Sequence, residues 1–492
     1  MFVLSSKCEM LIAFSQLPPA PPPALPPACL PFDPAWQVHN LGYLNICCPD
    51  CGALHWLDER LSKSSILSPR FGMCCYQGKV LLPPIQPPPI ELYRLLTSQE
   101  PPAKKFRQHI RNYNNALAMT SVGRKLDDSL NRQGGGPYSF RLHGEVIHRV
   151  GSLLPPEGQA PVFAQLYIYD NAQQAHEYHA ANAFNATLDP GTLCELQDML
   201  WHSHPGVAHY KQAYQLSLAV PPEQQCRIAL CFDATCDRRR YQAPDASVRE
   251  IAVILPGDED QVRGSQDIIL YCNHGPPLQC ISDTHPFYPA LRYVLLYPTG
   301  QLSFHPTILY QTVEEGAPRC GRERIYVSMG EFYHYRLFIR APDVESNHFF
   351  LTGNLYQEYV CEIWAISEQN CLNFIRLNQD KLRTDVYSGI VDADWSQLGT
   401  RFILPSSFSG STRHMQQLCQ DALAINRYYG GGDLFITMTA NTGWLEVQSA
   451  LFPGQHASDR PDLVVRAFKA KLESLIKDIS CHDAQPVVRI RG

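Results

Sequence analysis

Two closely spaced pairs of cysteines constrain the fold of this chain more than any other feature of its sequence. The stretch "CCPDCGALHW" holds Cys48 and Cys51, and "FGMCCYQGKV" holds Cys74 and Cys75 after a spacer of 22 residues. A C-x2-C turn points both sulfurs the same way, which suits one tetrahedral ion. The pattern therefore predicts a small zinc-binding module over residues 36–95. The zinc ion would be structural, because four protein ligands leave no open position for a substrate.

The second pair departs from the usual spacing of such modules. Adjacent residues in an extended chain point to opposite sides. We therefore expect one of Cys74 and Cys75 to ligate more easily than the other, with His55 or Cys47 as a reserve ligand. The alternative is a set of buried free thiols. The chain has 18 scattered cysteines, a usage that favours a reducing compartment over a secreted disulfide scaffold.

Length and composition indicate a multidomain α+β protein. A chain of 492 residues is expected to form roughly three folding units. Many of its 40 prolines lie near the N-terminus, as in "LPPAPPPALPPACLP", which predicts a disordered leader. Beside the cysteine module, the predicted segments are the leader (1–35), a mixed α/β region (100–320), a helical region ending in one β-α unit (325–480) and a divergent tail (481–492).

Hydrophobic patterning predicts the individual elements. Short apolar runs bounded by turns, such as "EIAVILPG" and "RYVLLYPTG", are typical of strands, and so is "DLFITMTAN" from Asp433. Apolar residues three or four apart predict helices after residue 325. In the longest helix, the expected buried stripe is Tyr359, Ile363, Ile366, Leu372 and Ile375.

Capping residues predict where the last two helices begin and end. Gly410 and Ser411 precede one helix, and the glycines at 430–432 end it. Asp459 is the expected N-cap of the final helix, and Pro461 suits its first turn.

Basic residues gather in one segment that also holds Phe106 and Tyr113. Cations interleaved with aromatic rings suit single-stranded DNA, through phosphate contacts and base stacking. The candidate DNA-binding residues are Lys104, Lys105, Arg107, Arg111, Arg124 and Lys125. Residues 238–240 and the face bearing Arg466, Lys469 and Lys477 could extend this surface. An ordinary solvated face is the alternative for each patch, and the net charge of −6 argues against a uniformly basic, DNA-coating protein.

Several catalytic patterns are absent from the sequence or incomplete. No G-x-x-x-x-G-K-[ST] phosphate-binding loop occurs, and "HEYHA" lacks the second histidine of a zinc-protease motif. The pair His202 and His204 falls at an expected helix end, where a surface coincidence explains it. No apolar run approaches the roughly 18 to 20 residues of a membrane span, so we expect no membrane partner.

A series of sequence blocks nevertheless resembles one family. The blocks include "CPDCGALHW", "FRQHIRNYNNALAMTSVG", "HPFYPALRYVLLYPTG", "LNFIRLNQDKLRTDVY", "LPSSFSGSTRHMQQLCQDALAINRYYGGGDLFITMTAN" and "DRPDLVVRAFKAKLESLIKDI". From about Cys47 to Ile479, they resemble in sequence and order the N-terminal region of the Helitron transposon protein. That protein is a rolling-circle replication initiator fused to a helicase.

The resemblance also implies what should follow these blocks. "DLFITMTAN" is similar to the first strand of the family's nuclease domain. The next strand should carry two histidines that hold a divalent metal, and a later tyrosine should attack the DNA phosphate. After Ile479 the sequence instead reads "SCHDAQPVVRIRG". Ala440 and Thr442-Gly443 also depart from the family's Cys and Pro-Lys. We therefore expect no enzymatic activity from this chain alone.

The implied function is that of the DNA-engaging, catalytically incomplete N-terminal part of a Helitron-type transposase/helicase. The implied partners are DNA, including single-stranded transposon ends, and a complete transposase acting in trans. The implied localisation is nuclear. Two alternatives stay open: a non-enzymatic transposon remnant or interaction protein without DNA binding, and a clipped view of an active nuclease-helicase.

Overall fold

The structure is a computed structural model that describes part of the chain. It covers residues 39–122, 185–207, 286–311, 324–342, 345–379, 404–430 and 434–480, and short strands or single residues elsewhere. The chain divides into two compact units. The first unit comprises Met1–Tyr43, Asn370–Ala450 and Leu463–Gly492, and the second comprises Leu44–Gln369 and Leu451–Asp462. The predicted tail at 481–492, and the predicted leader apart from two residues, lie outside the described residues.

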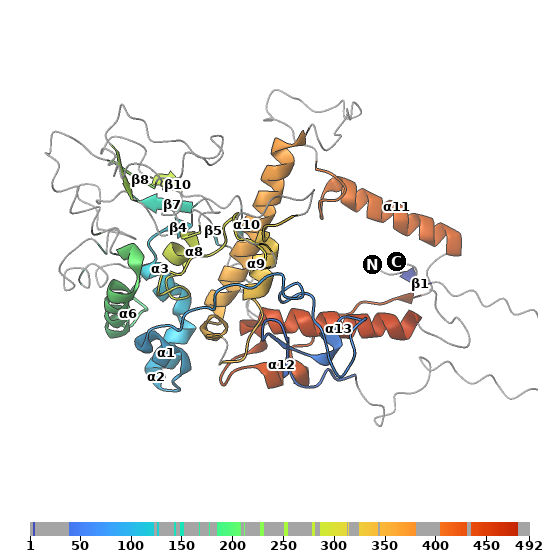
Figure 1. Ribbon diagram of the computed structural model, residues 1–492, viewed down its shortest axis with the longest axis horizontal. Helices are drawn as coiled ribbons and strands as arrows, with labels where there is room; N and C mark the ends of the chain where they lie inside the picture. The colour runs from blue at the N-terminus through green and yellow to red at the C-terminus, as the bar shows by residue number, and fades with distance from the viewer. Residues whose placement is uncertain are drawn as a thin grey trace, which may run out of the picture. The chain divides into compact units, whose positions relative to one another are not determined.

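Helices dominate the described residues (Figure 1). They are α1 (Ile90–Thr97), α2 (Pro101–Gln108), α3 (Ile110–Leu117), α6 (Pro190–Ser203), α8 (Tyr288–Arg292), α9 (Met329–Arg336), α10 (Asn354–Leu377), α11 (Thr412–Tyr429), α12 (Leu445–Ala450) and α13 (Pro461–Ser480). The helices predicted after residue 325 are thereby confirmed as α9, α10, α11 and α13.

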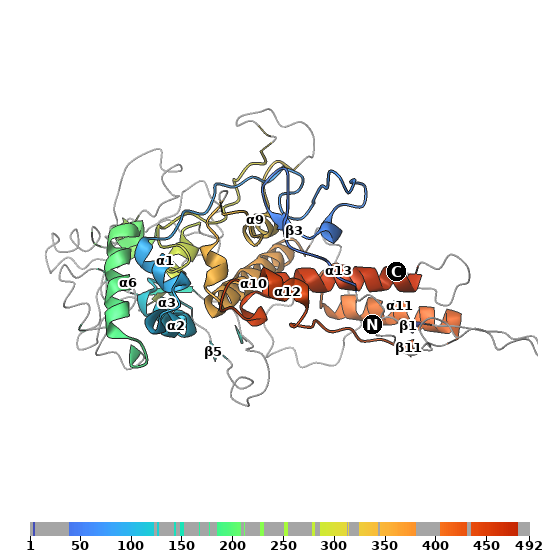
Figure 2. The same cartoon turned by 90° about the horizontal axis from the view of Figure 1, so that it is seen from below.

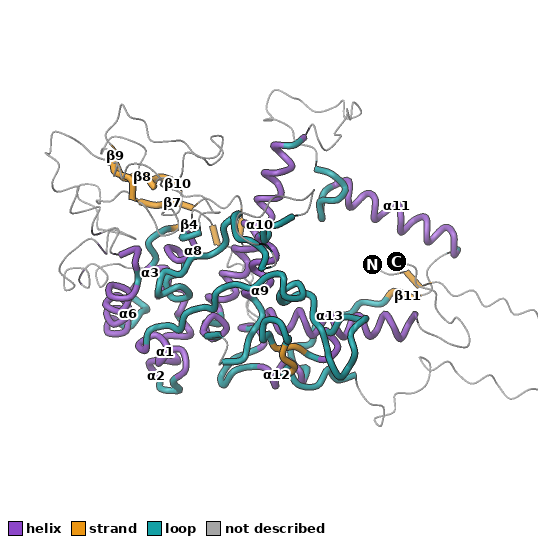
Figure 3. Tube along the Cα trace, in the orientation of Figure 1, coloured by secondary structure: helices purple, strands orange, loops and turns teal. Residues whose placement is uncertain are grey.

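The described strands are all short (Figure 3). Two antiparallel pairs join β2 (Ile46–Cys47) to β3 (Leu54–His55) and β5 (Lys125–Leu126) to β6 (Leu142–His143). A three-stranded sheet has the order β10 (Leu278–Cys280), β7 (His148–Gly151), β4 (Ser121–Val122). The parallel pair is β8 (Arg227–Leu230) with β9 (Glu250–Val253), and β1 (Val3–Leu4) pairs antiparallel with β11 (Leu434–Phe435). The chain thus combines helices with small sheets, as the expected α+β class requires.

The second unit is built around one apolar core. Helix α1 packs against α2 and α6, and Figures 1 and 2 show this group from two sides. The core extends to the aromatic rings of Tyr293, Tyr297, Phe349 and Tyr359, which meet edge to face. Edge-to-face ring pairs add stabilisation beyond the area that they bury.

The predicted buried stripe of α10 is largely confirmed, and two carboxylates share the same face of the helix. Tyr359, Ile363 and Ile366 are buried, as is Ile375 further along the helix, whereas Leu372 is half-buried. Glu358 and Glu362, four residues apart, share this inner face and are buried too. Every carboxylate oxygen on it has a donor, as buried charge requires.

Glu358 and Glu362 are held by partners from distant parts of the second unit. Glu358 forms ion pairs with Arg292 at 2.6 Å and with Arg111 at 2.5 Å. Glu362 accepts hydrogen bonds from the hydroxyls of Tyr288 and Tyr293. Burial raises the pKa of Tyr293 well above its ordinary value, and the nearby carboxylates add to the effect. Tyr293 therefore stays a hydrogen-bond donor at neutral pH.

Helix α11 begins and ends where the sequence predicts. The Ser411 hydroxyl accepts from the backbone N–H of His414 at 3.1 Å, which caps the helix start. Gly430 ends the helix at φ 76°, in the left-handed region that favours glycine. None of the described side chains of α11 is buried.

A small polar network organises the described part of the first unit. Glu446 in α12 pairs with Lys471 of α13 at 2.7 Å and accepts from the backbone N–H of Leu41 at 3.0 Å. Val447 and Leu463 are buried in the same unit. Three segments far apart in sequence therefore meet at one carboxylate.

Three sequence predictions are wrong in detail. "RYVLLYPTG" is a buried series of turns after α8, in which Leu296 and Tyr297 both donate backbone N–H groups to Tyr293. Periodicity alone does not separate a short buried strand from other buried structure. "DLFITMTAN" forms a strand only at Leu434–Phe435, and residues 436–440 are irregular. Asp459 ends a short 3-10 turn, and α13 begins two residues later at Pro461.

Within the described part of the chain, no helix combines the length and apolar character needed to cross a membrane.

Candidate metal centre

The first cysteine pair sits in the tight connection between β2 and β3. The backbone N–H of Cys48 donates to the carbonyl of Ala53 at 2.8 Å, and Gly52 donates back to Cys48 at 2.9 Å. Gly52 adopts φ 72°, which a glycine reaches without the strain that a Cβ would cause. These bonds close the turn and direct the sulfurs of Cys48 and Cys51 to the same side.

The second pair sits in a loop of consecutive turns rather than an extended segment. Tyr76 and Gln77 have φ of 51° and 59°, and Gly78 follows at 81°. The backbone N–H of Gly78 donates to the Cys75 sulfur at 3.2 Å. The expectation that Cys74 and Cys75 point to opposite sides assumed an extended chain and is therefore wrong, because both residues lie in turns and both sulfurs join the same group.

All four sulfurs meet in one buried group. The ligand atoms of Cys48, Cys51, Cys74 and Cys75 lie within 4.8 Å of one another, and the four side chains are at most 6% exposed. The sulfur of Cys75 lies 3.8 Å from those of Cys48 and Cys74. Zn–S bonds of about 2.3 Å place tetrahedral sulfurs about 3.8 Å apart, whereas a disulfide needs about 2.05 Å. The four-cysteine group has the size of a metal site.

The pKa values of the four thiols are shifted in different directions. Hydrogen bonds from the other thiols, that of Cys51 first, hold the pKa of Cys48 well below its ordinary value. The pKa of Cys51 is lowered to about 7; its bond with Cys48 raises the pKa, and its bonds with Cys74 and Cys75 outweigh that. Bonds to Cys48 and Cys51 raise the pKa values of Cys74 and Cys75. The thiols therefore differ in acidity, and a bound cation would displace their protons.

The two reserve ligands lie outside this group of four sulfurs. The ring of His55 stacks on Phe71 with centroids 3.9 Å apart, and its Nδ1 lies 3.0 Å from a Glu59 carboxylate oxygen. Cys47 is exposed on β2. Both Cys74 and Cys75 join Cys48 and Cys51, so the set needs neither reserve.

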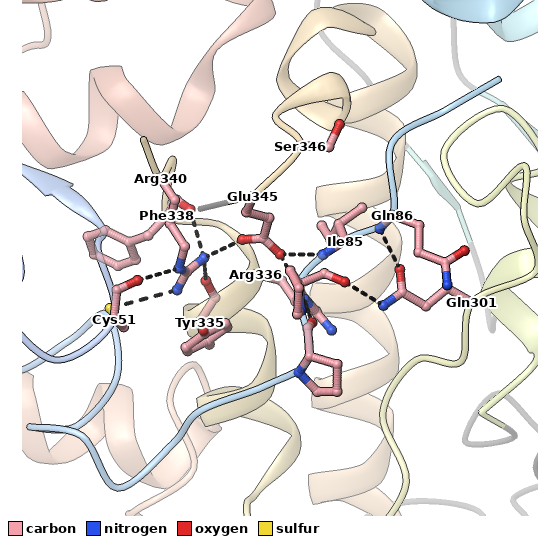
Figure 4. Close-up of polar contacts among 12 residues, drawn as sticks. Cys51, Ile85, Gln86, Gln301, Tyr335, Arg336, Phe338, Arg340, Glu345 and Ser346 are labelled. Carbon is pink, nitrogen blue, oxygen red and sulfur yellow. Dashed lines mark hydrogen bonds and ion pairs between the residues drawn. The ribbon is translucent and has the colours of Figure 1, made fainter. Parts of the chain in front are cut away.

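Arg340 is a functional candidate that the sequence did not single out. It is 1% exposed, and its guanidinium lies against Cys51 (Figure 4). The backbone at Arg340 also forms an isolated antiparallel bridge with Ala53. In the sequence, Arg340 looks like any other basic residue beside an apolar run. Its contact with Cys51, 289 residues away, cannot be predicted from the neighbouring residues.

The structure separates the six candidate DNA-binding residues. Lys104 and Lys105 are exposed on α2. Arg107 donates to the backbone carbonyls of Leu95 and Ser98 at 2.9 and 2.7 Å. Arg111 is paired with Glu358. Arg124 lies outside the described residues, and of Lys125 only the backbone, in β5, is described.

The two aromatic rings of the basic segment are not exposed for stacking. Phe106 and Tyr113 are buried and pack against each other with ring centroids 5.2 Å apart. The expectation that these rings stack on bases is wrong, because they belong to the core between α2 and α3. Of the additional patches, residues 238–240 lie outside the described residues. On α13, Lys469 is exposed and lies 3.9 Å from Glu473.

Comparison with protein-family models identifies the C-terminal part of the described chain. Residues 332–488 match the family model described as the Helitron helicase-like domain at the N-terminus. A search of curated proteins finds no match. The matched range begins within α9 and includes α10, α11, α12 and α13, and it also includes Arg340 beside the cysteine group.

Proposed function

From the match of residues 332–488 to the Helitron helicase-like domain at the N-terminus, we propose that the chain is the DNA-engaging N-terminal part of a Helitron-type transposition protein, stabilised by a structural zinc ion. The family match supports the transposition role, and the buried four-cysteine group supports the structural metal. A nuclear location follows from the transposon role of the family.

Zinc is the metal that this set of ligands suits best. Four thiolates at tetrahedral spacing are typical of structural zinc sites, and they leave no coordination position open. Each sulfur belongs to a turn that contributes few apolar residues of its own, so the ion would join the two turns. In zinc-finger peptides such binding contributes about 10–16 kcal/mol to folding at neutral pH.

The metal content of the purified full chain tests the zinc proposal. We expect one zinc per chain by inductively coupled plasma mass spectrometry, and its loss in Cys75→Ser. Cys47→Ser is the matched control, because Cys47 is exposed and adjacent to Cys48 but lies outside the group. Loss of zinc in both variants, or in neither, contradicts the assignment.

The proposed DNA contacts centre on Lys104 and Lys105. These are the candidate residues whose described side chains lie exposed, since Arg107 and Arg111 are engaged within the protein. Their chemistry fits phosphate contacts without base recognition, because lysine presents a flexible point charge. Single-stranded transposon ends are the proposed ligand, and a complete transposase is a proposed partner in trans.

Binding to a fluorescent single-stranded oligonucleotide, followed by anisotropy over a salt series, tests this role. For Lys104→Gln with Lys105→Gln, we expect weaker binding and a salt slope reduced by roughly 0.7 per lysine. Lys63→Gln with Lys79→Gln makes the same change of charge at two exposed lysines of the cysteine module and should bind like the wild type. Absence of binding by the wild-type chain favours the remnant or interaction-protein alternative.

We also propose that this chain alone neither cleaves DNA nor hydrolyses ATP. The support comes from the sequence, which has no phosphate-binding loop and no histidine pair around an apolar residue after the strand at Leu434–Phe435. Incubation of the purified chain with single-stranded DNA and Mg²⁺ or Mn²⁺ should leave the strand intact. Cleavage that a chelator abolishes would support the clipped nuclease-helicase alternative.

A further inference from the structure

We propose that Arg340 is a positioning residue of the metal site, which couples metal binding by the cysteines to the segment that follows α9. This inference rests on the structural metal proposed above. It adds that the site depends on a cation from the Helitron-like region, a residue far from the cysteines in sequence.

The contacts of Arg340 with Cys51 are direct. Its Nε donates to the Cys51 carbonyl at 3.1 Å, and its Nη2 lies 3.9 Å from the Cys51 sulfur (Figure 4). The fixed fork of a guanidinium lets one side chain serve both acceptors. Arg340 therefore fixes the position of the fourth residue of the C-x2-C turn and meets its sulfur.

The rest of the guanidinium is held so that it cannot turn away. Its Nη1 donates to the backbone carbonyls of Tyr335 and Phe338 at 2.9 and 3.1 Å, and to Glu345 Oε2 at 2.9 Å. The guanidinium carbon lies 3.6 Å from the ring centroid of Tyr335. Each of the three guanidinium nitrogens therefore has at least one acceptor, as a buried arginine requires.

The charges around the cluster match a bound dication with four thiolates. Such a centre carries a net negative charge, which is costly to bury without a compensating cation. Glu345 is shared between Arg340 and Arg336, each at 2.9 Å, so this group of three has a net positive charge. Of these two arginines, Arg340 is the one that contacts Cys51, whereas Arg336 donates to the Pro83 carbonyl at 2.8 Å.

Arg336 therefore provides a matched control. It is buried, is paired with the same carboxylate and comes from the same helix end. A purely structural role would make Arg340→Met and Arg336→Met similar in every metal measurement. A positioning role would make only the Arg340 variants differ.

Zinc affinity of the full chain, measured by chelator competition, is the first test. Residues that support metal ligands typically change affinity by about 10–100-fold when replaced. We expect a loss of that size in Arg340→Met and near wild-type affinity in Arg336→Met. Equal losses in the two variants, or no loss in either, would overturn the proposal.

The spectrum of the cobalt-substituted chain is the second test, because folding defects alone do not move it. A guanidinium directed at a thiolate withdraws electron density from the sulfur. Its removal should shift the thiolate-to-cobalt charge-transfer band to lower energy in Arg340→Met and Arg340→Lys, but not in Arg336→Met. If Arg340→Met does not fold, Arg340→Lys decides alone, and an unmoved band refutes the role.

The two proposals fail in different ways. If the wild-type chain binds neither zinc nor cobalt, the structural metal is wrong and the role of Arg340 fails with it. If the wild type holds one ion tightly and the band of the Arg340 variants stays in place, only the role of Arg340 is refuted.

Discussion

Helices α10 and α11 have the same kind of apolar periodicity, yet only α10 buries its apolar residues. Tyr359, Ile363 and Ile366 of α10 are at most 5% exposed. On α11, Met415 and Leu418 are 56% and 50% exposed, and none of its described side chains is buried. Periodicity thus predicts a helix and its apolar face, whereas burial depends on partners elsewhere in the chain.

The polar residues of the two helices explain part of this difference. On α10, two carboxylates face the core because two arginines and two tyrosines from distant segments meet them. On α11, local caps at Ser411 and Gly430 satisfy the backbone at the two helix ends. We therefore expect mutations in α10 to act on the whole second unit and mutations in α11 to act locally.

The largest loss of folding stability should come from Glu358→Ala. Removal of this carboxylate takes an ion-pair partner from the buried Arg292 and from the partly buried Arg111, so we expect a loss of about 3–5 kcal/mol. Chemical denaturation of the chain measures it. Glu368→Ala, on the exposed side of the same helix, should change stability by less than about 0.5 kcal/mol. Equal effects would mean that the charge network does not anchor α10.

Two truncations of apolar side chains test burial directly. Ile363→Ala should cost about 2–5 kcal/mol, because it removes buried methyl groups and leaves a cavity. Leu418→Ala on α11 should stay within about 0.5 kcal/mol. Hydrogen exchange followed by mass spectrometry reports both helices in one sample. A large cost for Leu418→Ala would show that a partner covers α11 in solution.

Replacement of either of two serine N-caps by alanine should cause a smaller loss of stability, of similar size in both helices. Ser328 and Ser411 each accept a backbone N–H at the start of a helix, and replacement of such a cap by alanine costs about 1 kcal/mol. Ser328→Ala should speed hydrogen exchange at the start of α9, and Ser411→Ala at the start of α11. A global loss of stability in Ser411→Ala would contradict the local character assigned to α11.

The sequence was informative where the geometry is local. The C-x2-C spacing, the cap at Ser411 and the glycine at 430 determine their turns within a few residues. The structure confirms both ends of α11 and the convergence of the cysteine sulfurs, and the zinc ion stays a proposal. The prediction of a strand in "RYVLLYPTG" was wrong because a short apolar run is compatible with several buried conformations. The prediction that Cys74 and Cys75 point to opposite sides was wrong because it assumed an extended chain, whereas these residues lie in consecutive turns.

Contacts between residues far apart in the sequence could not be predicted either. Arg111 was a candidate for DNA binding from its basic neighbours, but its partner is Glu358, 247 residues away. No sequence pattern marked Arg340 as functional, although it contacts both the cysteine turn and Glu345. A single sequence shows which side chains carry charge, whereas the tertiary fold decides whether that charge is solvated or paired.

X-ray absorption at the zinc edge of the purified full chain tests the four-cysteine site most directly. The four buried sulfurs predict one zinc per chain with four sulfur neighbours at about 2.3 Å and no nitrogen or oxygen. A nitrogen neighbour would bring His55 into the site in place of a cysteine. A chain purified without zinc that does not take up the ion would contradict the structural metal itself.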